Sequence, residues 1–183
     1  RTGLATVTIP QEVLADHIGQ SSGNVKLSVT KVDTAGLPEE TRKTIGNNAV
    51  YDFNLRVDGN KVSKFSSGEK DAYVQIAVDY TLKPGENSGN IVVYYINDEG
   101  RLEVVKNGKY DPATGKVIFR VSHFSKYTAA YTAVTFKDAK KLPWAKAGVE
   151  ALAARGIIDT NTLKAEKNVS RAEFIYMLVN ALD

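Results

Sequence analysis

His123 and Ser125 are the pair in this sequence whose types and spacing suit acid–base chemistry. An imidazole can take the proton of a neighbouring hydroxyl, and a serine activated in this way can attack a carbonyl carbon. A structural interpretation stands beside the chemical one. In that interpretation the two residues close a turn between a strand that ends near Val121 and one that begins near Tyr127, where they satisfy backbone groups.

The composition argues against several kinds of functional site in this chain. The chain has no cysteine and two histidines, so a disulfide, a thiolate zinc site and a catalytic metal centre are not expected, and neither is a cofactor. A net charge of +3, with Lys and Arg interleaved among Asp and Glu, does not provide the concentrated basic face that nucleic acid requires. No apolar run approaches the roughly 20 residues of a membrane span. The first residues also lack the apolar core of a signal peptide, so the chain is expected to be a mature or excised fragment.

The first two thirds of the chain show period-two alternation, which is typical of strands with one face toward a core. The alternating rows are Val25, Leu27 and Val29; Tyr51, Phe53, Leu55 and Val57; Val74, Ile76, Val78 and Tyr80; Val92, Tyr94 and Ile96; and Val117, Phe119 and Val121. Turn-forming residues such as Asp58-Gly59 and Pro84-Gly85 separate the rows. Residues 1–133 are therefore predicted to form an antiparallel β-sandwich of seven or eight half-buried strands. Short helices are expected near Pro10 to His17 and near Pro38 to Ile45.

Residues 134–183 have a helical period and are predicted to form a helical hairpin. Val149, Leu152 and Ala153 recur at helical spacing, and Gly156 is placed to end that helix. A second helix begins with Ser170-Arg171-Ala172-Glu173, which has the pattern of a capping box. This helix is apolar on nearly every side from Phe174 to Val179, so one preceding helix cannot cover it. The fold class is thus mainly β with a small α part, and we expect the second helix to be covered by further helices or by a second copy of the chain.

This tail resembles the S-layer homology (SLH) family, whose repeat joins a Phe-x-Asp start, a Trp-Ala helix that ends in Gly-Ile, and a Thr-Arg-Ala-Glu-like second helix. The matching residues are Phe136, Asp138, Trp144, Ala145, Gly156, Ile157, Ser170, Arg171, Ala172, Glu173 and Phe174. The sequence departs from the family in the loop from Asp159 to Val169, which is shorter and has no glycine. The resemblance implies three such repeats in one helical bundle, of which this chain holds one.

The resemblance also implies binding to a pyruvylated secondary cell-wall polysaccharide, and so attachment of a secreted protein to a Gram-positive cell wall or S-layer. Arg171 can form a bidentate contact with a carboxylate, and Trp144 offers a flat face to a sugar ring. Asp138 and Glu173 complete the expected glycan-binding set. Three of the four have a structural alternative: Trp144 as a core anchor, and Asp138 and Glu173 as helix caps.

Two further resemblances concern the sandwich. Its last part, from Val104 to Tyr127, is similar to the sandwich segment that often precedes SLH repeats. The triplet His123-Phe124-Ser125 is similar to the His-Phe-Ser of self-cleaving β-sandwich domains, in which serine attacks the preceding carbonyl in an N-to-O acyl shift. The leading hypothesis is a non-catalytic module of the cell surface. The alternatives are a self-processing domain cut once at Phe124-Ser125 and a carbohydrate-binding sandwich, for which nine tyrosines are a hint.

Overall fold

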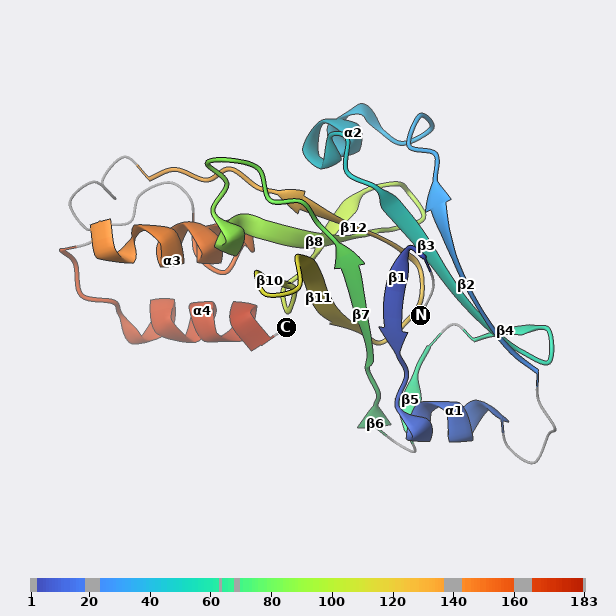
Figure 1. The fold of residues 1–183 in the computed structure, drawn as a ribbon. Helices are drawn as coiled ribbons and strands as arrows, with labels where there is room; N and C mark the ends of the chain where they lie inside the picture. The colour runs from blue at the N-terminus through green and yellow to red at the C-terminus, as the bar shows by residue number, and fades with distance from the viewer. Residues whose placement is uncertain are drawn as a thin grey trace.

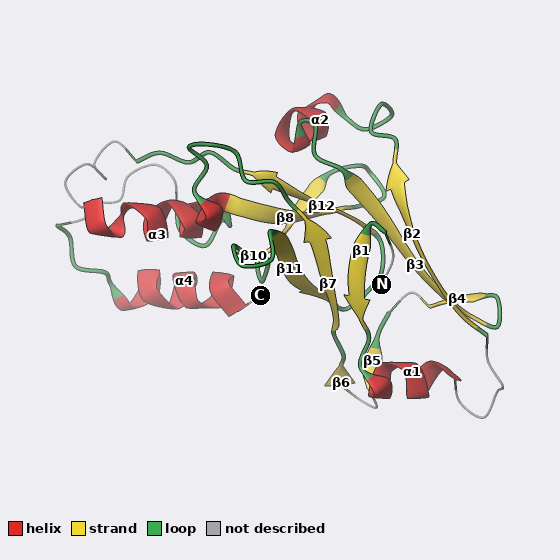
Figure 2. Ribbon diagram, in the orientation of Figure 1, coloured by secondary structure: helices red, strands yellow, loops and turns green. Residues whose placement is uncertain are grey.

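The structure is a computed structural model that describes residues 3–18, 24–62, 64–67, 70–136, 143–159 and 166–182. Two antiparallel β-sheets pack face to face, and two helices follow them at the C-terminal end (Figure 1; Figure 2). The predicted antiparallel β-sandwich followed by helices is confirmed. The two C-terminal helices, α3 (Pro143–Ala154) and α4 (Arg171–Leu182), both begin toward the left of Figure 1, so they run in the same direction and do not form the predicted hairpin. None of the helices in these described ranges is long and apolar enough to cross a membrane.

One sheet has four strands and the other has six. The four-stranded sheet has the order β1 (Ala5–Thr8), β7 (Val74–Asp79), β11 (Lys116–Val121) and β10 (Lys109–Asp111). The six-stranded sheet has the order β2 (Val25–Val32), β3 (Val50–Val57), β12 (Lys126–Tyr131), β8 (Ile91–Ile96) and β9 (Leu102–Val105), and β4 (Asn60–Val62) also pairs with β3. A small separate ribbon consists of β5 (Ser66–Ser67) and β6 (Lys70–Asp71). Every strand pair in this part of the chain is antiparallel.

The core lies between the two sheets and is built from alternate residues of each strand. The four-stranded sheet contributes Val74, Ile76, Val78, Val117, Phe119 and Val121, and the six-stranded sheet contributes Phe53, Leu55, Ile91, Val93, Tyr127 and Ala129. The predicted rows on β3, β7 and β11 all face this core. Aromatic rings close it near one end, where Phe124 stacks on Phe53 and meets Phe65 edge-on, with centroids 6.0 and 4.7 Å apart.

The row Val92, Tyr94 and Ile96 faces the other way, so the prediction of a half-buried strand was wrong for β8. Ile91 and Val93 point into the sandwich core, whereas Val92 and Tyr94 pack on the outer face with Ala154 of α3 (Pro143–Ala154). Ile96 packs on that outer face with Ile45 of α2 (Glu39–Ile45). A strand covered on both faces has no polar side and reads as a continuous apolar run, here Ile-Val-Val-Tyr-Tyr-Ile.

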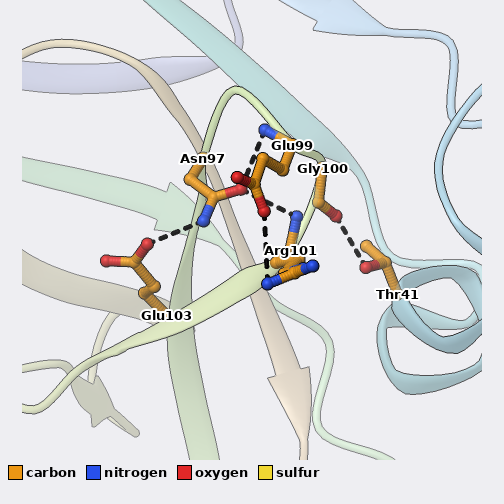
Figure 3. Close-up of polar contacts among 6 residues, drawn as sticks. All are labelled: Thr41, Asn97, Glu99, Gly100, Arg101 and Glu103. Atoms are coloured by element: carbon orange, nitrogen blue, oxygen red, sulfur yellow. Dashed lines mark hydrogen bonds and ion pairs between the residues drawn. The ribbon is translucent and has the colours of Figure 1, made fainter.

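The turn between β8 and β9 is joined to α2 by a hydrogen bond from a side chain to the backbone (Figure 3). The hydroxyl of Thr41, on α2, donates to the carbonyl oxygen of Gly100 at 2.7 Å. Within the turn, Oδ1 of Asn97 accepts from the backbone N–H groups of Glu99 and Arg101, both at 3.0 Å. Gly100 has a φ of +77°, and a Cβ there would lie 2.7 Å from Cδ of Pro38. Both conditions require glycine at this position.

The predicted short helices are confirmed as α1 (Gln11–Ile18) and α2. The prediction of seven or eight strands was too low, since twelve are present in the described residues. The strands without a predicted row are short or lack alternation. β12, for example, places Thr128 and Ala130 on a buried outer face and Tyr127 and Ala129 in the core. Because several of its residues are small or polar, the sequence of β12 does not indicate a strand that is buried on both sides.

Part of the free edge of β11 is occupied by a side chain. β10 pairs with β11 only as far as Ile118, which leaves the last three residues of β11 without a strand on that side. Asn107 fills part of this gap: its Nδ2 donates to the carbonyl oxygen of Arg120 at 3.0 Å, and its Oδ1 accepts from the N–H of Arg120 at 2.7 Å. Both backbone groups of an edge residue are therefore satisfied without a neighbouring strand.

Candidate functional site

Trp144 lies on the first turn of α3 and is largely exposed to solvent. The helix begins at Pro143, whose fixed φ suits a first helical position. The indole of Trp144 is 83% exposed, the highest value among the large apolar side chains of the described residues. The interpretation of Trp144 as a core anchor was therefore wrong. Phe136 and Ala153 fill the small core beside α3 instead.

The second helix, α4 (Arg171–Leu182), begins with the predicted capping box. The N–H of Ser170 donates to Oε2 of Glu173 at 2.8 Å, and the N–H of Glu173 donates to Oγ of Ser170 at 3.2 Å. Each side chain thus satisfies a backbone donor that the helix leaves unpaired. The capping role of Glu173 is confirmed, and its role in binding glycan stays a prediction.

Arg171 is the first residue of α4 and is exposed to solvent. Its guanidinium forms no ion pair with any described residue, so its donors are available to an anion. The position adds a partial positive charge from the helix N-terminus. Both α3 and α4 begin toward the left of Figure 1, so the helix starts that carry Trp144 and Arg171 lie toward the same end of the helical region in this view. Asp138 lies outside the described residues, as does the loop segment 160–165.

Most of the apolar surface of α4 is uncovered, as the sequence predicted. No residue of this helix is buried. The exposed apolar side chains are Phe174, Ile175, Tyr176, Leu178, Val179 and Leu182, each 46–78% exposed. Only Met177 and Asn180, three residues apart on one helix face, are half-buried. A helix with this much exposed apolar surface is suited to a protein interface.

His123 and Ser125 lie together between β11 and β12, but the hydrogen bonds described for them are formed with other residues. Nε2 of His123 is 3.3 Å from the hydroxyl of Tyr127, which also donates to the carbonyl oxygen of His123 at 2.9 Å. The carbonyl oxygen of Ser125 accepts from the N–H of Phe53 at 3.0 Å, which joins the turn to β3. Burial lowers the pKa of His123, with Glu103 opposing and Lys64 assisting the shift. This shift favours the neutral imidazole, whose ring meets that of Tyr95 edge-on at 5.0 Å.

The tyrosines do not form an exposed aromatic row on the described part of the sandwich. Tyr94 and Tyr127 are buried, and Tyr95 and Tyr131 are half-buried. Tyr73, at 52% exposure, is the exposed aromatic side chain of the described sandwich. A flat platform for a glycan chain therefore finds no support in these residues.

Arg155 was not singled out from the sequence, yet its side chain forms the most extensive set of hydrogen bonds in the C-terminal helices. It follows α3 directly, before Gly156, whose φ of +68° ends the helix. The N–H of Ile157 returns to the carbonyl oxygen of Leu152 at 3.0 Å, as in a Schellman motif. A basic residue at a helix C-terminus is common, and nothing in the sequence indicates that this one bonds to the sandwich.

Comparison with known proteins agrees with the geometry of the tail. Residues 135–175 match the model of the S-layer homology domain. The chain is also 30% identical, over 198 aligned residues, to an amylopullulanase from Thermoanaerobacterium thermosulfurigenes. The alignment covers 94% of this chain and 10% of that protein, so the chain spans about a tenth of the relative's length. No solved structure matches the chain significantly.

These findings define the class of the protein. The chain carries an S-layer homology domain, a non-catalytic module by which surface proteins are held at the cell wall. The domain lies in the C-terminal helices, and a β-sandwich precedes it. The location that this domain indicates is the cell surface.

Proposed function

We propose that this chain is the anchoring end of a secreted protein of a Gram-positive-type bacterium, and that its helical repeat contributes to binding of secondary cell-wall polysaccharide. The sandwich acts as the spacer that joins the anchor to the remainder of the protein. The observation that carries the proposal is the pair of exposed side chains at the starts of α3 and α4, Trp144 and Arg171.

The chemistry of these two side chains suits a pyruvylated sugar. An exposed indole stacks on the apolar face of a pyranose ring, and a guanidinium without a partner pairs with the carboxylate of a pyruvyl ketal through two parallel hydrogen bonds. Trp144 packs into no core, so its exposure has no structural explanation within the described residues. Glu173 contributes by fixing the first turn of α4, and thereby the backbone position of Arg171.

The length of the relative supports a parent protein with more domains than this chain. The relative is about ten times as long as the aligned region, and we propose that the parent protein holds further domains and further repeats. Neighbouring repeats cover the apolar surface of α4 and complete a groove of which this repeat supplies one side. The similarity to an amylopullulanase makes a polysaccharide-degrading enzyme our proposal for the parent protein.

The test is cosedimentation with purified cell walls. The chain alone is expected to bind weakly, because a single contact offsets little of the cost of association. A version extended by two further repeats is expected to bind well. In the extended version, Trp144→Ala and Arg171→Ala should each weaken binding by about 1–3 kcal/mol, or roughly 5- to 150-fold.

Matched controls separate specific contacts from general loss of surface. Tyr73→Ala removes an exposed aromatic ring from the sandwich, and Arg101→Ala removes an exposed guanidinium from the β8–β9 turn. Both should bind like the parent. On walls stripped of pyruvyl groups, Arg171→Ala and the unsubstituted extended version should bind equally, because the carboxylate that Arg171 recognises is gone. The proposal fails if Arg171→Ala binds normal walls as well as the parent does.

A further inference from the structure

The C-terminal end of α3 is joined to the sandwich by one half-buried side chain, that of Arg155. The guanidinium of Arg155 donates to the carbonyl oxygen of Ile91, at the start of β8, at 3.1 Å, and to that of Gly108, just before β10, at 3.0 Å. It also donates to the carbonyl oxygens of Gly89 and Ala151, the latter at 2.9 Å. β8 belongs to the six-stranded sheet and β10 to the four-stranded sheet. Arg155 thus joins the start of β8, the loop that leads into β10 and its own helix.

The surface of the sandwich around Arg155 packs closely against α3. A Cβ at Gly89, in the short helix η1 (Ser88–Asn90), would lie 3.0 Å from Cβ of Ala151, so the backbones of η1 and α3 meet closely. Nδ2 of Asn87 donates to the carbonyl oxygen of Ala147 at 3.3 Å. Ala154 completes an apolar cluster with Val92 and other residues of the outer sheet face. Small residues face one another where the backbones approach, and polar groups are paired at the rim.

The segment that leads from the sandwich to α3 is held at its beginning as well. The backbone N–H of Thr132 donates to the carbonyl oxygen of Asn90 at 2.9 Å, and Nδ2 of Asn90 donates back to the carbonyl oxygen of Thr132 at 3.2 Å. Asn90 is completely buried. Four residues later, Phe136 is buried against Ala153 of α3. The link is therefore fixed at both of its described ends.

From these contacts we infer that the sandwich and the first SLH helix form one rigid body, that Arg155 is the positioning residue that holds them together, and that the sandwich sets the direction in which the rest of the anchor leaves. The sandwich then does more than separate domains, because its outer face provides the packing surface of α3. α4 remains free to meet other repeats. This inference stands whether or not the repeat binds glycan, so failure of wall binding does not affect it.

The first test is hydrogen exchange on the full chain with Arg155→Lys. Lysine keeps the charge and most of the length, but an ammonium group lacks the planar fork that reaches several carbonyl groups at once. Amides in residues 150–154 are expected to exchange at least about tenfold faster than in the parent. Amides of β7 serve as an internal reference. If the β7 amides accelerate as much as those of residues 150–154, α3 and the sandwich open as one unit. If the β7 amides keep their rate, α3 detaches alone. Both results support the role of Arg155, and unchanged exchange in residues 150–154 overturns it.

A matched control and a second variant keep the test decisive. Arg101→Lys changes an arginine whose side chain is 76% exposed, and should leave exchange in α3 unchanged. If Arg155→Lys does not fold, Gly89→Ala tests the contact between η1 and α3 without altering a charge, since its Cβ meets Ala151.

Rigidity itself is measured by the distance between two spin labels. The chain has no cysteine, so Lys26→Cys on β2 and Gly148→Cys on α3 give two unique, exposed attachment points. The parent should give one narrow distance distribution, and Gly89→Ala should broaden it. A broad distribution in the parent would show that the two parts move independently and would overturn the inference.

Discussion

The hydroxyl groups of Tyr94 and Thr132 form a hydrogen bond of 2.6 Å on the outer face of the six-stranded sheet, beneath α3. Tyr94 is 6% exposed, so its hydroxyl has little access to water and depends on this partner. Thr132 lies where the sandwich ends and the link to α3 begins. The bond therefore joins the middle of β8 to the start of that link.

We expect Tyr94→Phe to lower the free energy of unfolding by about 1–2 kcal/mol, because it leaves the half-buried Thr132 hydroxyl without its partner. The measurement is urea unfolding followed by circular dichroism. Tyr73→Phe, at an exposed site, is the control and should be neutral. Equal effects of the two changes would contradict the role assigned to the bond.

Replacing Gly100 by alanine should destabilise the chain by more than about 1 kcal/mol, since the new methyl group adopts a positive φ and meets Pro38. Gly115→Ala is the matched control: its φ is +65°, but no atom lies within 4 Å of the added Cβ. It should cost less, and the difference between the two variants measures the contact between the β8–β9 turn and α2. Thermal unfolding of both variants would decide the point, and equal losses would remove the argument for a close contact.

Stability should decrease at high pH, beginning near pH 10. Burial and the nearby Glu86 raise the pKa of Tyr80 to about 12, and burial raises the pKa values of Tyr94 and Tyr127. The unfolded chain then loses its tyrosine protons near pH 10 while the folded chain keeps them, so unfolding becomes more favourable as pH rises. The stabilising effect is complete below pH 10 and, for Tyr80, disappears as pH rises to about 12. Tyr80→Phe should reduce this slope, and an unchanged slope would contradict the shift.

The chain is expected to remain uncut at Phe124-Ser125. His123 contacts Tyr127, the carbonyl oxygen of Ser125 is bound by Phe53, and the positive φ that signals backbone strain occurs outside glycine only at Asp58 among the described residues. Mass spectrometry of denatured protein after long incubation should give one full-length mass, as it should for Ser125→Ala. Two fragments that meet between Phe124 and Ser125, absent in the variant, would establish self-cleavage.

Isolated chains are expected to associate through α4, because its apolar side chains are open to solvent. Light scattering coupled to gel filtration should show dimers at high concentration. Replacing Ile175 and Val179 by glutamate should give a monomer with an unchanged fold. A parent chain that stays monomeric and binds no hydrophobic dye would contradict this expectation.

The sequence predicted the sandwich well where a strand has one buried face. The rows on β3, β7 and β11 alternate because polar residues face outward. It assigned β8 only one buried face and showed no alternating row for β12. Helices cover the outer faces of both strands, and a pattern of period two disappears when both sides are apolar. At the site, the capping box of Ser170 and Glu173 was readable because it is local. The hydrogen bonds of Arg155 to the sandwich could not be predicted, because its partners there lie 47 to 66 residues away in the chain.

The pairing of the Asn107 side chain with the backbone of Arg120 has a consequence for molecules crowded together on a surface. An open strand edge offers its backbone groups to any other strand, and this is the usual route to edge-to-edge aggregation. At the unpaired end of β11, a carboxamide already occupies the N–H and the carbonyl oxygen of the same residue. A neighbouring copy cannot extend the sheet there without first displacing it. Asn107 thus blocks edge-to-edge strand pairing at this end of β11.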